Sequence, residues 1–210
     1  SFAAKLKYAF QAPRTSEQAL IYKGAYQGVG LAIHDFNPQL GNPVSAYLFQ
    51  GATIATLAKR LSLNYEWDFG LTYGWKPYDK DKHPENHVIG SKMTAYINAN
   101  VYLRWALSNH WDLNLGGAFT HYSNGNTSMP NAGLNAFEGR LSMAYYINRD
   151  LDYEDSRPLP AFQKNLHTDV TLYGAWKRKG VDTTEGAYAI PGTFGVIGFN
   201  INPMYGMNHW

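Results

Sequence analysis

Apolar and polar side chains alternate along two long segments of the chain. From Leu61 to Trp75, every odd position carries an apolar or aromatic side chain, and every even position carries a polar side chain or glycine. The segment from Ile89 to Leu107 repeats this alternation, with its apolar positions again odd. Successive residues of a β-strand point to opposite faces. Both segments therefore predict strands with one apolar face and one polar face.

The predicted strands are unusually long. Strands in soluble proteins usually have about 3–10 residues, whereas a transmembrane strand needs about 9–11 residues within the bilayer. Both segments are long enough to cross a membrane and to project beyond it. Weaker or equal alternation predicts further strands at Phe2–Phe10, Ile21–Phe36, Val44–Ala58, His110–Ser123, Ala132–Asn148, Leu166–Arg178 and Thr193–Met204. The pattern thus predicts nine strands and no convincing helix.

The charged face of these strands favours a membrane barrel over a soluble one. A soluble β-sandwich or lipocalin-like barrel would not carry charged residues such as Glu66, Asp68 and Arg104 along one face of such long strands, opposite so wide an aromatic face. Aromatic residues also gather towards strand ends, as in the girdles of outer-membrane barrels: Tyr73, Trp75, Trp105, Trp111, Tyr145 and Trp176. We therefore predict an all-β fold, an antiparallel transmembrane β-barrel of about 8–10 strands, with residues 1–210 as one outer-membrane domain.

Composition excludes several other classes. Charged residues make up 16% of the 210 residues and aromatic residues 15%, whereas an average soluble protein has about 25% charged residues. No run approaches the roughly 18–20 apolar residues that a membrane helix needs. The chain has no cysteine, which rules out a thiol nucleophile and a cysteine-ligated metal. The net charge of +2 is too small to suggest a nucleic-acid partner.

Loop lengths predict the orientation of the barrel. Outer-membrane barrels have short periplasmic turns and long extracellular loops. The short link Lys59–Arg60 is therefore assigned to the periplasm, and the longer links Lys76–His87 and Asn124–Asn131 to the outside. Bacterial single-chain barrels have even strand numbers, so nine strands lead us to expect more strands before Ser1 and after Trp210, in a larger barrel.

The segment from Thr120 to Asn135, THYSNGNTSMPNAGLN, carries the candidate chemistry. Residues two positions apart in a strand share a face, so His121 and Ser123 lie side by side, as a general base and a nucleophile would. The odd positions before them are apolar, which places both residues on the lipid-facing side. A nucleophile there would meet an ester of an outer-leaflet lipid. The alternative is an ordinary polar strand end that leaves the membrane.

The motif His121-Tyr122-Ser123-Asn124, followed by Pro130-Asn131-Ala132-Gly133-Leu134, resembles the signature of the PagL family of outer-membrane lipid A 3-O-deacylases. Strand order and loop placement fit this family best over residues 21–148. The Tyr-Gln-Gly-Val-Gly and Trp-Lys-Pro-Tyr stretches resemble its longer Bacteroidetes members, the acyloxyacyl hydrolases. The resemblance implies an eight-stranded barrel with a serine-esterase triad, in which Ser123 is the nucleophile and His121 the general base. The third member in the family is a glutamate, where this sequence has Asn135.

Strand parity favours Asn135 over Glu138 as the partner of His121. Asn135 shares the odd, lipid-facing side with His121, whereas Glu138 points into the lumen towards Arg140. The asparagine carbonyl can accept the Nδ1–H of the imidazole and select the useful tautomer, but it cannot stabilise the imidazolium by charge. We therefore expect a slower enzyme, or one with a less demanding ester.

Asn124 and Gly125 are the candidates for oxyanion binding, because they follow the nucleophile and glycine can turn successive amides towards one point. An ordinary loop is the alternative. The acidic residues and histidines of the Lys76–His87 loop could contact lipid phosphates through divalent ions, but a solvated loop is the simpler interpretation. We predict no metal site and no cofactor.

Three functions follow from these observations. The first is a serine esterase of the bacterial outer membrane that removes an ester-linked acyl chain from lipid A or lipopolysaccharide (LPS), with its active site facing the extracellular leaflet. The second is a phospholipase, and the third is a catalytically silent structural or scaffold barrel in an outer-membrane complex. Asn135 favours the silent barrel, whereas the His-x-Ser-Asn motif favours activity. The expected partners are lipid A, LPS and other outer-membrane lipids, and a homodimer or larger outer-membrane complex is also considered.

Overall fold

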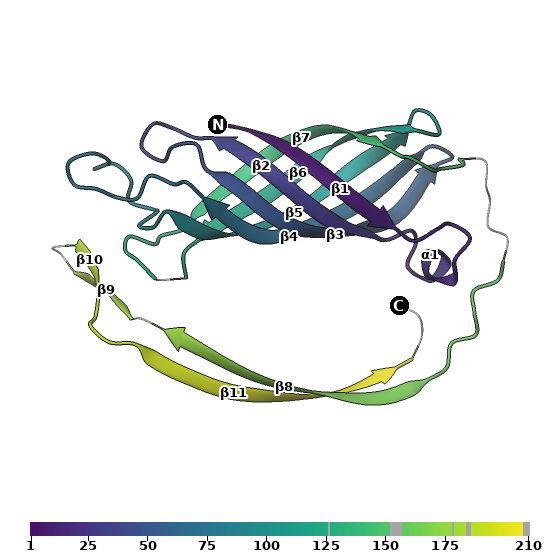
Figure 1. The fold of residues 1–210 in the computed structure, drawn as a ribbon. Coiled ribbons are helices and arrows are strands. Elements are labelled where there is room, and N and C mark those ends of the chain that lie inside the picture. The colour runs from purple at the N-terminus through teal and green to yellow at the C-terminus, as the bar shows by residue number, and fades with distance from the viewer. Residues whose placement is uncertain (126, 152–156, 178, 184–185, 208–210) are drawn as a thin grey trace.

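The structure is a computed structural model, and it describes all residues except 126, 152–156, 178, 184–185 and 208–210. Nearly all regular structure in the described residues is β-strand (Figure 1). The strands are β1 (Phe2–Gln11), β2 (Tyr26–Asp35), β3 (Val44–Ala58), β4 (Leu61–Tyr73), β5 (Met93–Ala106), β6 (Trp111–Ser123), β7 (Leu134–Tyr145), β8 (Asn165–Lys177), β9 (Gly180–Thr183), β10 (Gly186–Ala189) and β11 (Phe194–Gly206). One short helix, α1 (Glu17–Ile21), lies between β1 and β2.

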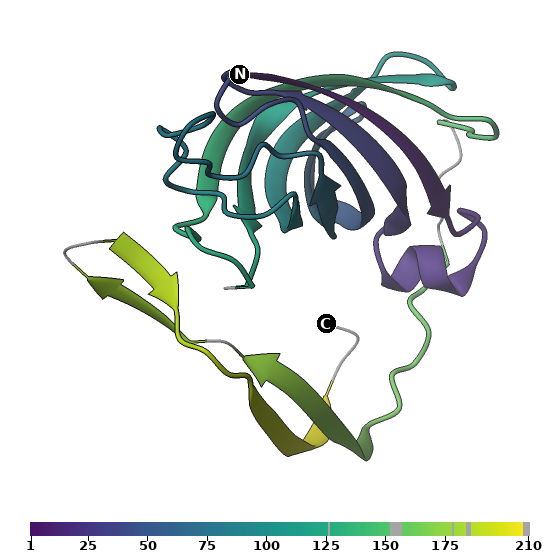
Figure 2. The same ribbon diagram turned by 60° about the vertical axis from the view of Figure 1, so that its left-hand side comes forward.

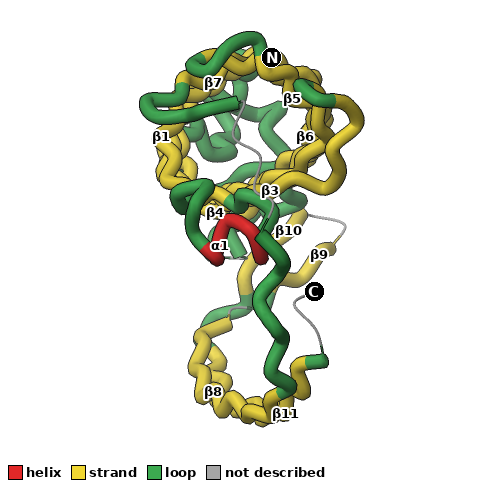
Figure 3. The backbone as a smooth tube through the Cα atoms, turned by 90° about the vertical axis from the view of Figure 1, so that its right-hand side faces the viewer, coloured by secondary structure: helices red, strands yellow, loops and turns green. Residues whose placement is uncertain are grey.

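Seven strands form one antiparallel sheet, in sequence order from β1 to β7. The sheet curls around an axis, so that its edge strands β1 and β7 come near each other (Figure 3). In the described residues no backbone ladder joins these edges, but Lys5 Nζ of β1 donates to Glu138 Oε2 of β7 at 3.0 Å. The sheet is the curved wall of a β-barrel, so the predicted all-β antiparallel fold is confirmed.

The last four strands lie apart from this sheet (Figure 2). β8 pairs with β11 and β9 pairs with β10, both antiparallel. The predicted strands Leu166–Arg178 and Thr193–Met204 agree closely with β8 and β11, although Arg178 lies outside the described residues. The short strands β9 and β10 are not predicted, because four residues are too few to show an alternating pattern. A single barrel domain over residues 1–210 stays a prediction.

Exposure along the wall follows the predicted faces. In β4, Trp67 and Phe69 are 47% and 55% exposed on the outside, whereas Glu66 and Asp68 are 5% and 1% exposed. Charged side chains can be buried in this way only when they are paired and hydrogen-bonded. The interior of the curled sheet must therefore hold a network of compensating charges.

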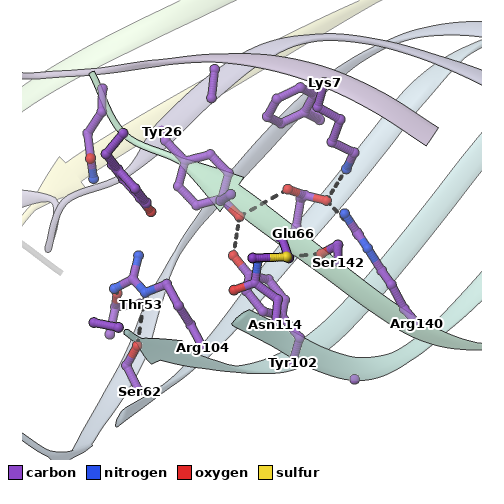
Figure 4. A pocket seen from close by; sticks show the side chains of 18 of the residues that line it. Lys7, Tyr26, Thr53, Ser62, Glu66, Tyr102, Arg104, Asn114, Arg140 and Ser142 are labelled. Atoms are coloured by element: carbon purple, nitrogen blue, oxygen red, sulfur yellow. Dashed lines mark hydrogen bonds and ion pairs between the residues drawn. The ribbon is translucent and has the colours of Figure 1, made fainter. Parts of the chain in front are cut away.

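Glu66 lies at the centre of that network (Figure 4). Its carboxylate accepts hydrogen bonds from Lys7 Nζ, from Arg140 Nη1 at 2.9 Å and from Tyr26 Oη at 3.0 Å. Lys7 and Arg140 come from the two edge strands, and Glu66 comes from the middle of the sheet. The side chains of the network thus link both edges of the wall across its interior.

Two residues that the alternation assigns to the outer face are buried instead. Trp75 is 2% exposed and donates from Nε1 to Thr94 Oγ1 at 3.0 Å, and Ile89 is 0% exposed. β5 begins at Met93, not at Ile89. The reason is that Ile89 belongs to a loop held by Asn86, whose amide group bonds both the N–H and the carbonyl of Ile89 at 3.0 Å. This loop folds inward over the end of the barrel.

The region before β2 also differs from the prediction. The strand begins at Tyr26 instead of Ile21, and the chain does contain one short helix, α1. Ser16 caps this helix, because its Oγ accepts from Ala19 N at 3.1 Å. Gly24, with a φ of +66°, then turns the chain into β2. A five-residue helix is too short to show helical periodicity in the sequence. Among the described residues, no helix has the length and apolar character needed to cross a membrane.

Candidate active site

His121 and Ser123 lie at the end of β6, on the outward face of the wall. Phe119, two residues before His121, is 39% exposed on this face. The alternate residues Thr120 and Tyr122 are 0% exposed and point inside. Both candidate residues are half-buried, so they are accessible from outside the barrel without projecting fully from it.

Asn135 holds the imidazole of His121 from the neighbouring strand. The two residues are directly opposite in the ladder between β6 and β7, and His121 Nδ1 donates to Asn135 Oδ1 at 2.6 Å. Because the amide oxygen can only accept, Nδ1 carries the proton and Nε2 presents its lone pair. The structure therefore contains the contact that strand parity predicts, and the imidazole has the tautomer that a general base needs.

Ser123 shares the face of His121 but does not yet bond to it. In the part of the chain that the structure describes, no hydrogen bond joins Ser123 Oγ to the imidazole. Hydrogen bonds between a nucleophile and its base are often long until substrate is bound. The strand thus places the two side chains on one face, two residues apart.

The residues after Ser123 form a tight loop. The Asn124 N–H donates to Asn131 Oδ1 at 3.1 Å, and Asn124 Nδ2 donates to Ser128 O at 2.8 Å. The Asn124 amide is therefore already engaged. Gly125 has a φ of +63°, and a Cβ placed on it would meet no atom within 4 Å. Of the two predicted oxyanion donors, Gly125 is therefore the one with open surroundings. Asn131 holds the loop by accepting the Asn124 N–H, a role that the sequence motif alone does not reveal.

Two glycines let backbone segments approach the site closely. Gly133 has a φ of +74°, and a Cβ placed on it would lie 3.1 Å from His121 Cε1. A Cβ on Gly90 would lie 2.4 Å from the carbonyl of Met129 and 2.7 Å from Pro130 O. The loop before β5 therefore packs directly on the turn that leads into β7. Nothing in the sequence around Gly90 signals this contact, because it joins two loops that are distant along the chain.

Glu138 lies inside the wall, as strand parity predicts. Its carboxylate accepts from Thr120 Oγ1 at 2.7 Å and from Lys5 Nζ at 3.0 Å. The expected partner Arg140 pairs with Glu66 instead, at 2.9 Å. The reason is that Lys5 comes from β1, at the other edge of the sheet, which only the curling of the wall brings near Glu138.

A second histidine–serine pair lies inside the barrel. His34 Nε2 and Ser45 Oγ are 2.8 Å apart, and Tyr122 Oη lies 3.3 Å from His34 Nδ1. His34 is 1% exposed and Ser45 is 0% exposed. The rings of Tyr96 and Tyr122, from the buried aromatic cluster, pack beside His34 with centroids 6.0 and 5.6 Å away. The pair is a buried structural contact, and the accessible pair is the one on β6.

A shallow apolar groove of about 700 Å³ lies on the outer wall next to the candidate site. Its floor includes Gly117 and Gly139, which are directly opposite in the ladder between β6 and β7. Phe119 and Phe137, with ring centroids 5.1 Å apart, stand between these glycines and the His121–Asn135 pair. Further lining side chains on the outer face are Tyr65, Trp67, Ala99 and Val101.

The loop between β4 and β5 shows no metal site. Among the described residues, no group of three or more histidine or acidic side chains is arranged to hold a metal ion. Asp79 instead accepts from the backbone N–H groups of Lys82 at 3.0 Å and Asp81 at 2.9 Å. These backbone hydrogen bonds hold the pKa of Asp79 below its usual value. This carboxylate organises its own turn.

The curled antiparallel wall, with charges inside and aromatic residues outside, defines the class of protein as a transmembrane β-barrel. The family model described as lipid A 3-O-deacylase (PagL) matches residues 4–144, which span nearly all of β1–β7 and include His121, Ser123 and Asn135. The chain therefore belongs to the PagL family of outer-membrane lipid A deacylases. No curated protein and no solved structure matches the chain.

Proposed function

We propose that the protein is a serine esterase that removes an ester-linked acyl chain from lipid A in the outer leaflet, with its active site facing the outside of the cell. The observation that carries this proposal is the 2.6 Å hydrogen bond between His121 and Asn135, on the same outward face as Ser123. This arrangement orients a general base beside a nucleophile where a lipid ester can reach both.

The reaction needs no group from outside the chain except water. His121 Nε2 takes the proton of Ser123 Oγ while Oγ bonds to the ester carbonyl carbon. The N–H of Gly125 donates to the oxyanion that forms. The ester C–O bond then breaks, and the proton on Nε2 passes to the leaving lipid hydroxyl.

The acyl-enzyme is hydrolysed by the same groups. His121 takes a proton from water while the water oxygen bonds to the acyl carbon. The bond to Ser123 Oγ breaks, Oγ takes the proton back, and the fatty acid leaves. Asn135 keeps His121 in the reactive tautomer throughout, without adding a counter-charge to the imidazolium.

Ser123→Ala tests this proposal. We expect wild-type protein, expressed in a host whose lipid A is a substrate, to remove one acyl chain that Ser123→Ala leaves in place, as read by mass spectrometry of lipid A. A fluorophosphonate probe should label the wild type and not Ser123→Ala. Ser45→Ala is the matched control, because it removes the hydroxyl of the buried pair. This variant should still remove the acyl chain and should still be labelled by the probe.

The other outcomes are distinct. Loss of phospholipid acyl chains with intact lipid A would identify a phospholipase. Intact lipid A, together with no probe labelling of a folded wild type, would identify a silent barrel. Inactivation by Ser45→Ala but not by Ser123→Ala would move the site to the barrel interior. Heat-dependent migration in gel electrophoresis checks that each variant folds.

A further inference from the structure

Two outward-facing glycines are not required by the packing of the chain. A Cβ placed on Gly139 would meet no atom within 4 Å, and a Cβ on Gly117 would meet only Glu138 O at 3.8 Å. The other glycines of the seven-stranded wall differ, because a Cβ on any of them would lie 2.0–2.4 Å from a neighbouring atom; on Gly28 or Gly70, that atom is a backbone oxygen at 2.0 or 2.1 Å. Glycine weakens a strand interior. Its use where the chain leaves room for a side chain points to an occupant from outside the chain.

The groove above these glycines lies on the same outer face as the candidate site and ends at the phenylalanines that stand beside it. Gly117 lies two residues from Phe119 on β6, and Gly139 lies two residues from Phe137 on β7. His121 and Asn135 lie two residues further along the same outward faces. The glycines, the phenylalanines and the catalytic pair therefore form three consecutive rows across two strands. An occupant of the groove that reaches the site must pass all three rows.

The distance from Ser123 to the two glycines matches the length of an extended acyl chain. The strand from Ser123 to Gly117 spans roughly 20 Å at about 3.4 Å per residue. The side chains that line the groove are aromatic and aliphatic, including Trp67 from β4 and Val101 from β5. An ester placed at Ser123 would extend its acyl chain over the phenylalanine row, and the end of the chain would lie over the two glycines.

We infer that Gly117 and Gly139 are specificity-determining residues that keep the groove open for the distal part of a long acyl chain. This inference rests on the proposed esterase function. A side chain at either position would fill the floor where only a long acyl chain reaches. A short acyl chain would end at the phenylalanine row, so hydrolysis of its ester would be slowed less by such a side chain.

Leucine substitutions test the inference. Purified wild type, Gly117→Leu and Gly139→Leu are compared on nitrophenyl butanoate, octanoate and tetradecanoate. For each glycine variant, we expect the ratio of kcat/KM for the tetradecanoate to that for the butanoate to fall by about tenfold or more, which is the range that pocket contacts with methylene groups produce. Ala46→Leu is the matched control, because Ala46 is an exposed small residue on β3 outside the groove, and its ratio should equal that of the wild type.

Each result decides one way. Ser123-dependent hydrolysis with an unaltered chain-length ratio in both glycine variants would overturn the inference and leave the proposed function standing. An equal loss on all three esters would also overturn it, because the glycines would then serve the wall and not the substrate. A change of oligomeric state in the variants would indicate a protein partner in the groove. No hydrolysis of any ester by folded wild type would overturn the proposed function and this inference together.

Discussion

At the scale of single residues, the question is what an asparagine does beside His121, the proposed general base. Asn135 Oδ1 accepts the Nδ1–H of His121 at 2.6 Å, so it fixes the tautomer as a carboxylate would. A carboxylate would also attract the positive charge that develops on the imidazole, and a neutral amide cannot. The nearest acidic residue along β7, Glu138, faces the interior and bonds to Lys5. The site therefore has orientation without charge compensation.

Asn135→Ala should lower the rate of ester hydrolysis by about 100-fold, because His121 loses the acceptor that selects its tautomer. Asn135→Glu should raise the rate by roughly tenfold, because it adds the missing counter-charge. The measurement is kcat on a nitrophenyl ester with purified, folded protein.

Glu138→Gln is the control for these variants, and it should change kcat by less than about threefold, since its side chain points to the opposite face of the strand. Inactivation by Glu138→Gln with full activity in Asn135→Ala would contradict the assignment, and would mean that β7 changes its register when substrate binds.

At the scale of elements, the loop between β4 and β5 supports the turn that leads into β7. Asn86 is 1% exposed and bonds backbone groups of Lys76, Val88 and Ile89. These hydrogen bonds of Asn86 fix the position of Gly90, whose backbone packs against that of Met129 and Pro130. The loop is therefore part of the scaffold that places Asn135 opposite His121.

Gly90→Ala tests that role. The added methyl group would lie 2.4 Å from the backbone of Met129, so the turn must shift. We expect kcat to fall by about tenfold, because small misplacements of catalytic groups have large effects, while the barrel remains folded. Gly195→Ala is the control, since a Cβ there would meet no atom within 4 Å. Equal activity of the two variants would show that the loop contact does not position the site.

At the scale of the whole molecule, the interior charge network holds the wall together. Glu66 receives hydrogen bonds from β1, β2, β5 and β7 through Lys7, Tyr26, Asn100 and Arg140. In the described residues, the two edge strands are not joined by a backbone ladder, so these side chains carry much of the link between them. A single carboxylate thus stabilises the shape of the sheet.

Glu66→Gln should lower the free energy of unfolding by about 3 kcal/mol, because it leaves the buried Arg140 without its anion and leaves Lys7 with Asp68 alone. Urea unfolding in lipid vesicles, followed by tryptophan fluorescence, measures this change. Glu85→Gln is the control, because Glu85 is exposed in the loop between β4 and β5 and should change the stability by less than about 0.5 kcal/mol. Equal stability of the Glu66 variant and the wild type would show that the network does not stabilise the wall.

The sequence by itself determined the wall and the face that carries the site. Period-two alternation is a local property of a strand, so the inward position of Glu138 and the outward positions of His121 and Asn135 follow from parity alone. The hydrogen bond between His121 and Asn135 also follows from parity, once the turn between β6 and β7 sets the register of the two strands. These features depend on neighbours in one strand or one hairpin.

Only the tertiary structure decided the contacts between segments that are distant along the chain. The burial of Trp75 and Ile89, the contact of Gly90 with Met129, and the pairing of Glu138 with Lys5 all depend on how the sheet curls and how its loops fold over the end of the barrel. An apolar residue in a loop can bury itself in any direction, because no periodic backbone fixes its face. Alternation describes the wall of a barrel, and only the curling of the sheet decides what its loops and edges touch.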